Sequence, residues 1–173
     1  WLNIHRELGV EFAGFDDRDL GRCVEDHARR HPNAPALRFM QCNFSYGEID
    51  ALANRFANVL VDLGVHKNDV VGLHLPNLPQ YAIALVAIAR VGCIGSGVSP
   101  LLAPVELAHQ IRDAGISVLL SLPELITPTL AAMDSIPDSL RAVLTTGAGD
   151  CLDAPPAPVP SLPDVACHSF AEL

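Results

Sequence analysis

Residues 70–98 read VVGLHLPNLPQYAIALVAIARVGCIGSGV, and their pattern indicates the fold class most clearly. It opens with an apolar run, Val70–Leu75, whose length and terminal proline are typical of a buried strand. Pro79 is a favourable first helical residue, and the nearly all-apolar Gln80–Val91 predicts a buried helix. Small residues over Cys93–Val98 predict a second strand. Strand, helix and strand in this order indicate a βαβ unit of a parallel sheet.

The same alternation continues on both sides of this unit. Upstream, the pattern Ser45-x-x-Glu48 is a capping box, in which hydroxyl and carboxylate satisfy free backbone N–H groups, and it predicts a helix over Glu48–Leu63. Gly64 is a plausible stop for that helix. The remaining predicted elements are a helix near Asp19–Arg29, strands at Ala36–Phe39 and Gln41–Ser45, helices at Pro104–Ala114 and Glu124–Met133, and strands at Ser117–Leu122 and Arg141–Thr145.

Right-handed crossovers would place helices on both faces of such a sheet. We therefore expect an α/β fold: a mainly parallel, doubly wound sheet flanked by helices, with a small N-terminal edge hairpin. The α/β subdomain should span residues 1–148. Residues 149–173 are predicted to be a proline-rich linker and the start of a following segment, because five of the 14 prolines lie between Pro155 and Pro163.

Composition excludes several classes of protein. The chain has 173 residues, of which 50% are hydrophobic, so it can fold around a core. With 11 Lys and Arg against 20 Asp and Glu, the net charge is −9, which argues against nucleic acid as a partner. The longest apolar run, Tyr81–Ala89, is far below the roughly 20 residues of a membrane-spanning helix. The five scattered cysteines favour a reducing, cytoplasmic location.

No complete catalytic constellation is visible. His74 is the most tempting general base, but a histidine in an apolar strand is more often a core residue held by a hydrogen bond. The glycines of 92–97 do not have dinucleotide-binding spacing and are better explained by close helix–sheet packing. The loop 145–149 has no following lysine for a phosphate and is interpreted as a turn. We therefore assign no residue to a catalytic, cofactor-binding or metal site.

Two short segments at strand ends are candidates for the rim of a ligand cleft. In open α/β sheets, ligands bind beyond the carboxyl ends of the strands. Pro76-Asn77 and Ser99-Pro100 follow two of the predicted strands. The competing interpretation, which we favour, is that both are simple turns in which Asn and Ser satisfy local backbone groups.

The chain resembles one known family. Ser45-Tyr46-Gly47-Glu48-Ile49-Asp50, Ala53-Asn54-Arg55-Phe56-Ala57 and Leu63-Gly64-Val65 are similar, in this order, to the opening of the adenylate-forming superfamily. Its members include acyl-CoA synthetases, aryl-CoA ligases, luciferases and the adenylation domains of peptide synthetases. The likeness covers roughly residues 19–145, with departures at Asn68, Gln80 and Ser99. Leu75-Pro76-Asn77-Leu78-Pro79-Gln80 is closer to the fatty-acyl and aryl CoA ligases.

The resemblance implies an enzyme that uses ATP, Mg²⁺ and coenzyme A to convert a carboxylic acid, most plausibly a fatty acid, first to an acyl-adenylate and then to an acyl-CoA. The family's phosphate loop, ribose-binding Asp and C-terminal Lys match no residue of this sequence. We therefore expect an N-terminal subdomain that binds no cofactor, is inactive alone and has the remaining subdomains of the parent as partners.

Two other classes stay open. The first is a non-catalytic α/β interaction module that docks a protein through the apolar helix at Tyr81–Ala89. The second is a flavodoxin-like cofactor binder, which shares the fold class but lacks an evident phosphate-binding loop. The open reading frame beyond Leu173 would separate the enzyme from the interaction module.

Overall fold

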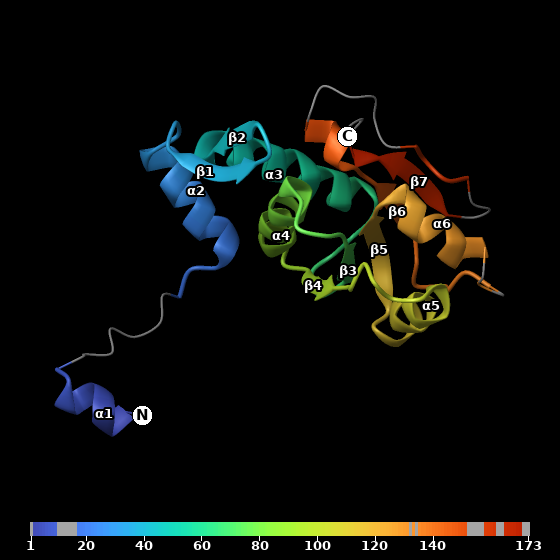
Figure 1. The fold of residues 1–173 in the computed structure, drawn as a ribbon, viewed down its shortest axis with the longest axis horizontal. Helices are drawn as coiled ribbons and strands as arrows, with labels where there is room; N and C mark the ends of the chain where they lie inside the picture. The colour runs from blue at the N-terminus through green and yellow to red at the C-terminus, as the bar shows by residue number, and fades with distance from the viewer. Residues whose placement is uncertain are drawn as a thin grey trace.

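The computed structural model describes residues 2–9, 17–131, 133, 135–151, 158–161 and 165–170. Within these residues the centre of the fold is a five-stranded parallel sheet in the order β4-β3-β5-β6-β7 (Figure 1). Its strands are β3 (Val70–His74), β4 (Ile94–Gly97), β5 (Ile116–Ser121), β6 (Ala142–Thr145) and β7 (Ala166–Ser169). The predicted parallel α/β architecture is thus confirmed.

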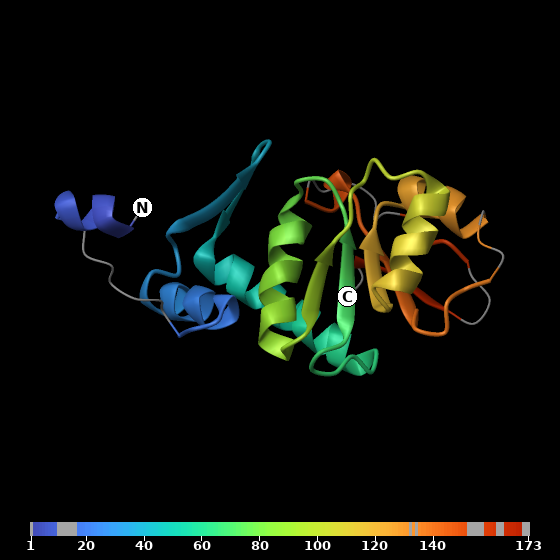
Figure 2. The ribbon, with the colours of Figure 1, turned by 90° about the horizontal axis from the view of Figure 1, so that it is seen from below.

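Helices cover both faces of the sheet, as expected for a doubly wound fold (Figure 2). Residues of α3 and α4 share one buried cluster with Val71, Leu73 and Val118 of the strands. Residues of α5 and α6 share another with Ile116, Leu119 and Val143. The helices are α1 (Leu2–Glu7), α2 (Leu20–Arg30), α3 (Tyr46–Asp62), α4 (Pro79–Val91), α5 (Pro104–Asp113) and α6 (Pro123–Ala131), with a 3₁₀ turn η1 at Ala148–Cys151.

The predicted capping box starts α3. Ser45 Oγ accepts from the Glu48 backbone N–H at 3.3 Å, and the Glu48 carboxylate accepts from the Ser45 N–H at 2.7 Å. These two hydrogen bonds satisfy donors that a helix N-terminus leaves free. They also hold the pKa of Glu48 below its usual value, mainly through the Ser45 backbone N–H.

The predicted hairpin is present as β1 (Pro35–Phe39) and β2 (Cys42–Ser45), paired antiparallel. It forms a two-stranded sheet of its own and does not extend the main sheet. Backbone hydrogen bonds tie its neighbourhood to the start of α3: Tyr46 N–H donates to Ala34 O, and Gly47 N–H to Pro32 O, each at 2.9 Å. The hairpin is therefore held beside the carboxyl edge of the sheet by α3.

A short strand that follows the proline-rich stretch belongs to the same sheet. β7 pairs in parallel with β6, Thr145 facing Ser169 in the register. The Phe170 ring then packs against Phe56 of α3, with ring centroids 5.0 Å apart. The boundary that we place at residue 148 therefore falls between two strands of one sheet.

Arg141 makes hydrogen bonds and an ion pair at the amino edge of the sheet. Its guanidinium donates to Gly64 O and, at 2.8 Å, to the Asp69 carboxylate, which also accepts from the His66 N–H at 2.9 Å. The His66 N–H first, and then Arg141, hold the pKa of Asp69 below its usual value. The end of α3 is thus linked to the start of β3 and β6.

Two further observations concern membrane-spanning helices and cysteines. None of the helices in the described ranges has the length and apolarity that a bilayer crossing requires. Among the described residues, Cys23 and Cys93 are thiols outside any disulfide.

Candidate functional site

The topology singles out the carboxyl ends of β3 and β5. These strands are neighbours, yet β3 leads into α4 on one face of the sheet and β5 leads into α6 on the other. Loops that diverge in this way leave a crevice between them, which is where open α/β sheets bind ligands. The candidate site is therefore built from the residues at these strand ends.

A row of polar side chains crosses the sheet at this edge. His74, Ser121, Thr145 and Ser169 stand opposite one another in the register of β3, β5, β6 and β7. Their neighbours in the strands alternate between the two faces, so the row shares the face covered by α5 and α6. Each of the four is at most 1% exposed. We call these residues the polar row.

His74 is a buried, neutral member of the polar row. Its Nδ1 lies 2.8 Å from Ser121 Oγ, and Ser121 in turn donates its single hydroxyl proton to Leu122 O at 3.2 Å. Ser121 must therefore accept from His74, which assigns the proton to Nδ1 and leaves a lone pair on Nε2. Burial lowers the pKa of His74, and the Ser99 backbone opposes this only in part.

This arrangement confirms the prediction of a hydrogen-bonded core histidine. His74 Nε2 has no hydrogen-bond partner among the described residues. Ser169 Oγ, at the other end of the row, also has none among them. A fully enclosed base cannot take a proton from a substrate without movement of its surroundings. The polar row is thus a buried structural layer at the carboxyl ends of the strands.

The two predicted rim segments behave differently. Ser99 Oγ accepts from the Leu101 N–H at 3.3 Å, which is the local turn contact that we predicted. Asn77 is exposed, and its side chain makes no hydrogen bond within the described part of the chain. It lines a groove of about 300 Å³ between β1 and the start of α4, together with Leu37, Arg38, Phe39, Leu78, Pro79, Tyr81 and Ala82.

Gln80 and Asp150 are residues that the sequence did not single out as partners. Gln80, 2% exposed, donates from Nε2 to Gly147 O at 2.9 Å, while its Oε1 has no partner among the described residues. Asp150 accepts from the Thr146 hydroxyl at 2.7 Å and the Gly147 N–H at 3.0 Å. The loop at 145–149 is thus a turn, as predicted, and α4 holds it in place.

The glycines of 92–97 have separate structural roles, and close helix–strand packing is seen at Gly97. Gly92 ends α4 with φ 79°, a left-handed conformation that favours glycine. A Cβ on Gly97 would lie 3.2 Å from the Tyr81 hydroxyl, so β4 and α4 lie close together there. The stretch forms the end of α4 and the strand β4.

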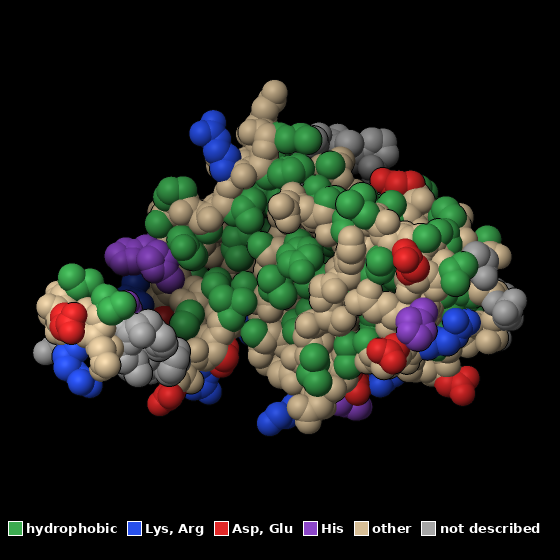
Figure 3. All heavy atoms as spheres, turned by 60° about the horizontal axis from the view of Figure 1, so that its bottom comes forward, with side chains coloured by type: hydrophobic (Ala, Val, Ile, Leu, Met, Phe, Trp, Pro, Cys, Tyr) green, Lys and Arg blue, Asp and Glu red, His purple; other side chains and the backbone are tan. Residues whose placement is uncertain are grey.

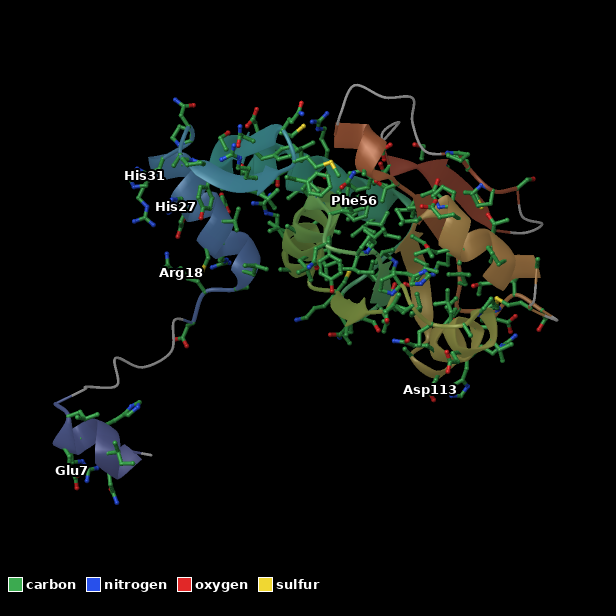
Figure 4. All side chains as sticks on the ribbon, in the orientation of Figure 1. Glu7, Arg18, His27, His31, Phe56 and Asp113 are labelled. Atoms are coloured by element: carbon green, nitrogen blue, oxygen red, sulfur yellow. The ribbon has the colours of Figure 1, made fainter. Side chains whose placement is uncertain are left out.

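The sequence interpretation overlooked one histidine pair. His27 and His31 are four residues apart at the end of α2, and their ring centroids lie 5.1 Å apart (Figure 4). His27 also packs on Tyr46, with ring centroids 4.1 Å apart. The spacing of the two residues could have revealed the pair. Nevertheless, the described residues hold no group of three or more His, Cys, Asp and Glu side chains that could bind a metal ion.

The fold is that of the first part of CoA ligases. The N-terminal domain of FACL13 from Mycobacterium tuberculosis superposes with a TM-score of 0.69 over 84% of this chain and 38% of that one, at 23% identity. The anthranilate CoA ligase AuaEII, in complex with anthranoyl-AMP, gives a TM-score of 0.70 over 75% of this chain and 25% of that one, at 23% identity.

Sequence comparison defines the family. The family model described as AMP-binding enzyme matches residues 24–164, and the chain therefore belongs to this family. The Long-chain-fatty-acid--CoA ligase of Escherichia coli O157:H7 is 33% identical over 154 residues, which cover 88% of this chain and 27% of that protein. The Acetyl-coenzyme A synthetase of Salmonella typhi is 35% identical over 124 residues, 66% of this chain and 19% of that protein. The chain thus spans about a quarter of the length of such relatives.

Proposed function

We propose that this chain is the N-terminal subdomain of an ATP-dependent acid–CoA ligase. The parent enzyme would join a carboxylic acid to AMP, releasing pyrophosphate, and then transfer the acyl group to coenzyme A, releasing AMP. The observation that carries the proposal is the family match over residues 24–164 together with relatives that share its fold and are themselves CoA ligases.

A fatty acid is the substrate class that we favour. The similarity to long-chain fatty-acid ligases extends over 154 residues, whereas that to acetyl-CoA synthetases extends over 124. A peptide synthetase of Streptomyces viridochromogenes matches 147 residues at 31% identity, so identity alone does not separate the substrates. The longer match and the Leu75–Gln80 pattern together support the fatty acid.

The described residues do not themselves fit ATP or Mg²⁺. The polar row is enclosed and made of neutral groups, and no carboxylate cluster for a cation occurs in the described ranges. Phosphoryl chemistry of this kind needs cationic groups that offset developing negative charge. We therefore place the ATP, Mg²⁺ and coenzyme A contacts in the other subdomains of the parent, and propose that the isolated chain is inactive. The cytoplasmic location stays a prediction.

The contribution of this chain would be to build one wall of the crevice. The polar row and the bond from Gln80 to Gly147 fix the ends of β3, β5 and β6, so the exposed Asn77 is presented on a rigid rim. The groove beside Asn77 is mostly apolar, which suits contact with the rest of the enzyme or with an acyl chain.

The test is product identification with the complete open reading frame that contains these 173 codons. The purified product, given ATP, Mg²⁺ and coenzyme A, should form palmitoyl-CoA in preference to acetyl-CoA, with both acids present at equal concentration. The 173-residue chain should form neither. A frame that ends at Leu173, or a product that forms no acyl-CoA from any acid, would favour the interaction module.

Asn77→Ala in the complete product separates a rim residue from a turn residue. If Asn77 contacts ligand or a neighbouring subdomain, turnover should fall at least about tenfold while the free energy of unfolding changes by less than about 1 kcal/mol. Asn58→Ala, at an exposed position of α3, is the matched control and should leave both unchanged. Unchanged turnover with lost stability in Asn77→Ala would make Asn77 a turn residue only.

A further inference from the structure

The end of α2 carries a pair of histidines that the proposed ligase activity does not use. His27 lies in the last turn of the helix and His31 is its C-cap residue, so the two side chains are one turn apart (Figure 4). His27 is half-buried and His31 is exposed. Figure 3 shows a group of histidine atoms at the surface on the left, the end of the molecule at which Figure 1 places α2. Solvent and small ions can therefore reach this histidine pair.

The separation of the two rings fits a single metal ion. Their centroids lie 5.1 Å apart, with an angle of 51° between the ring planes. Two imidazoles that bind one tetrahedral ion through nitrogen, with bonds of about 2.1 Å, have ring centroids roughly 5 Å apart. Neither His27 nor His31 uses a ring nitrogen in a hydrogen bond within the described part of the chain. The nitrogen lone pairs are thus available to a cation.

The backbone and a neighbouring ring hold the histidine pair in place. The His31 N–H donates to His27 O at 2.8 Å, which fixes the turn between them. The ring of His27 packs on that of Tyr46, with centroids 4.1 Å apart. Ligands that are ordered in advance lose less conformational freedom on binding. The carboxyl end of a helix also has a partial negative charge, which favours a cation there.

The surrounding side chains limit the protein ligands to two. Cys23 lies two helical turns before His31, about 12 Å along the axis, so one ion cannot bind both. Glu25 pairs with Arg29 at 2.6 Å, and Asp26 accepts from Arg18 at 2.9 Å, so both carboxylates are already engaged. This agrees with the finding that no larger group of metal-binding side chains occurs in the described ranges.

We propose that His27 and His31 chelate one divalent transition-metal ion of the Zn²⁺ type, with water in its remaining positions. Imidazole nitrogen suits Zn²⁺, Ni²⁺ and Cu²⁺, whereas Mg²⁺ and Ca²⁺ select oxygen ligands. The site is separate from the crevice at the carboxyl ends of the strands, and it does not depend on the proposed ligase activity.

The ion would join α2 to the connection that leads into the hairpin. Ala34 N–H donates to His31 O at 3.0 Å, and Tyr46 N–H donates to Ala34 O at 2.9 Å, so His31 begins a series of contacts that reaches α3. A ligand that binds only the folded chain stabilises it in proportion to the logarithm of its concentration above the dissociation constant. Zn²⁺ should therefore raise the melting temperature of the chain.

His27→Asn and His31→Asn test the site, because each leaves a single imidazole and removes the chelate. The affinity for Zn²⁺ should fall at least about tenfold in either variant, since the second ligand no longer binds at a high effective concentration. His109→Asn, at an exposed position of α5, is the matched control and should bind as wild type does. Cys23→Ser should also bind as wild type does, which separates the histidine pair from a site that uses Cys23 and His27.

The experiment is calorimetric titration of the purified 173-residue chain, without an affinity tag, with ZnCl₂ and separately with MgCl₂. Circular dichroism without metal checks that each variant is folded. We expect saturable Zn²⁺ binding that His27→Asn and His31→Asn both weaken, no binding of Mg²⁺ at this site, and joint shifts of the His27 and His31 ring ¹⁵N signals of wild type during the Zn²⁺ titration. Absence of saturable binding, ring signals that do not shift, or His31→Asn that binds as tightly as wild type would overturn the proposal. A loss of binding in Cys23→Ser would overturn it as well.

Discussion

Protonation of His74 should destabilise the fold, and the size of the effect follows from its surroundings. The imidazole is 1% exposed, donates from Nδ1 to Ser121, and has a pKa lowered by burial. In the unfolded chain its pKa is about 6.5. Between the two values only the unfolded chain binds the proton, so the free energy of unfolding falls as the pH drops below about 6.5. The slope from this one group approaches about 1.4 kcal/mol per pH unit.

His74→Asn removes the titration and keeps an N–H near the position of Nδ1. At pH 7.5 the variant should be less stable by about 1–3 kcal/mol, because the smaller side chain leaves unfilled space. Urea unfolding at pH 7.5, 6.5 and 5.5 measures the gap between wild type and variant. The gap should narrow between pH 6.5 and 5.5, by at most about 1 kcal/mol. His109→Asn, at an exposed position of α5, is the matched histidine substitution outside the core. A gap that is independent of pH would refute a buried, neutral His74.

Three further substitutions test the local structure. Ser45→Ala removes the capping hydroxyl of α3 and should cost about 1 kcal/mol, measured by thermal unfolding. Asp69→Asn should make the free energy of unfolding depend less on pH in the acid range. The wild-type carboxylate has a lowered pKa, so it stabilises the fold above about pH 4 and loses this effect as the pH falls through its folded pKa. Arg141→Ala should act in the same direction. Gln80→Ala removes the buried donor to Gly147 and should cost about 2 kcal/mol, with faster amide exchange over 146–150.

Local patterns were sufficient to predict most of the helices and strands, β7 being an exception. The capping box at Ser45 and Glu48, the proline at the start of α4 and the glycine at its end each act within one helical turn, so their effect can be inferred from the sequence. The β–α alternation then predicts the parallel sheet, because parallel neighbours need a crossover. The predicted bounds of β3, α4 and α5 differ from the observed ones by a residue or so.

The candidate site could not be assembled in the same way. The polar row depends on the register of strands that are far apart in the chain, and the contact of His74 with Ser121 joins residues 47 positions apart. The bond from Gln80 to Gly147 spans 67 positions. A one-residue shift of register would separate such pairs, and a single sequence does not define register at that precision.

β7 escaped prediction for a different reason. Ala166–Ser169 is short, follows a proline-rich stretch and carries a His and a Ser in place of a continuous apolar run. Such a segment has little strand signal of its own, and its pairing with β6 and the packing of Phe170 on Phe56 stabilise it. Tertiary contacts thus add an element that local pattern does not show.

The most direct test of the central claim is acid-dependent exchange of ³²P-pyrophosphate into ATP by the purified product of the complete open reading frame. This reaction reports acyl-adenylate formation alone and needs no coenzyme A. We predict exchange that requires Mg²⁺ and palmitate, falls with acetate and is absent with the 173-residue chain. Exchange that depends on an amino acid and not on palmitate, or no exchange with any carboxylic acid, would contradict the assignment to an acid–CoA ligase.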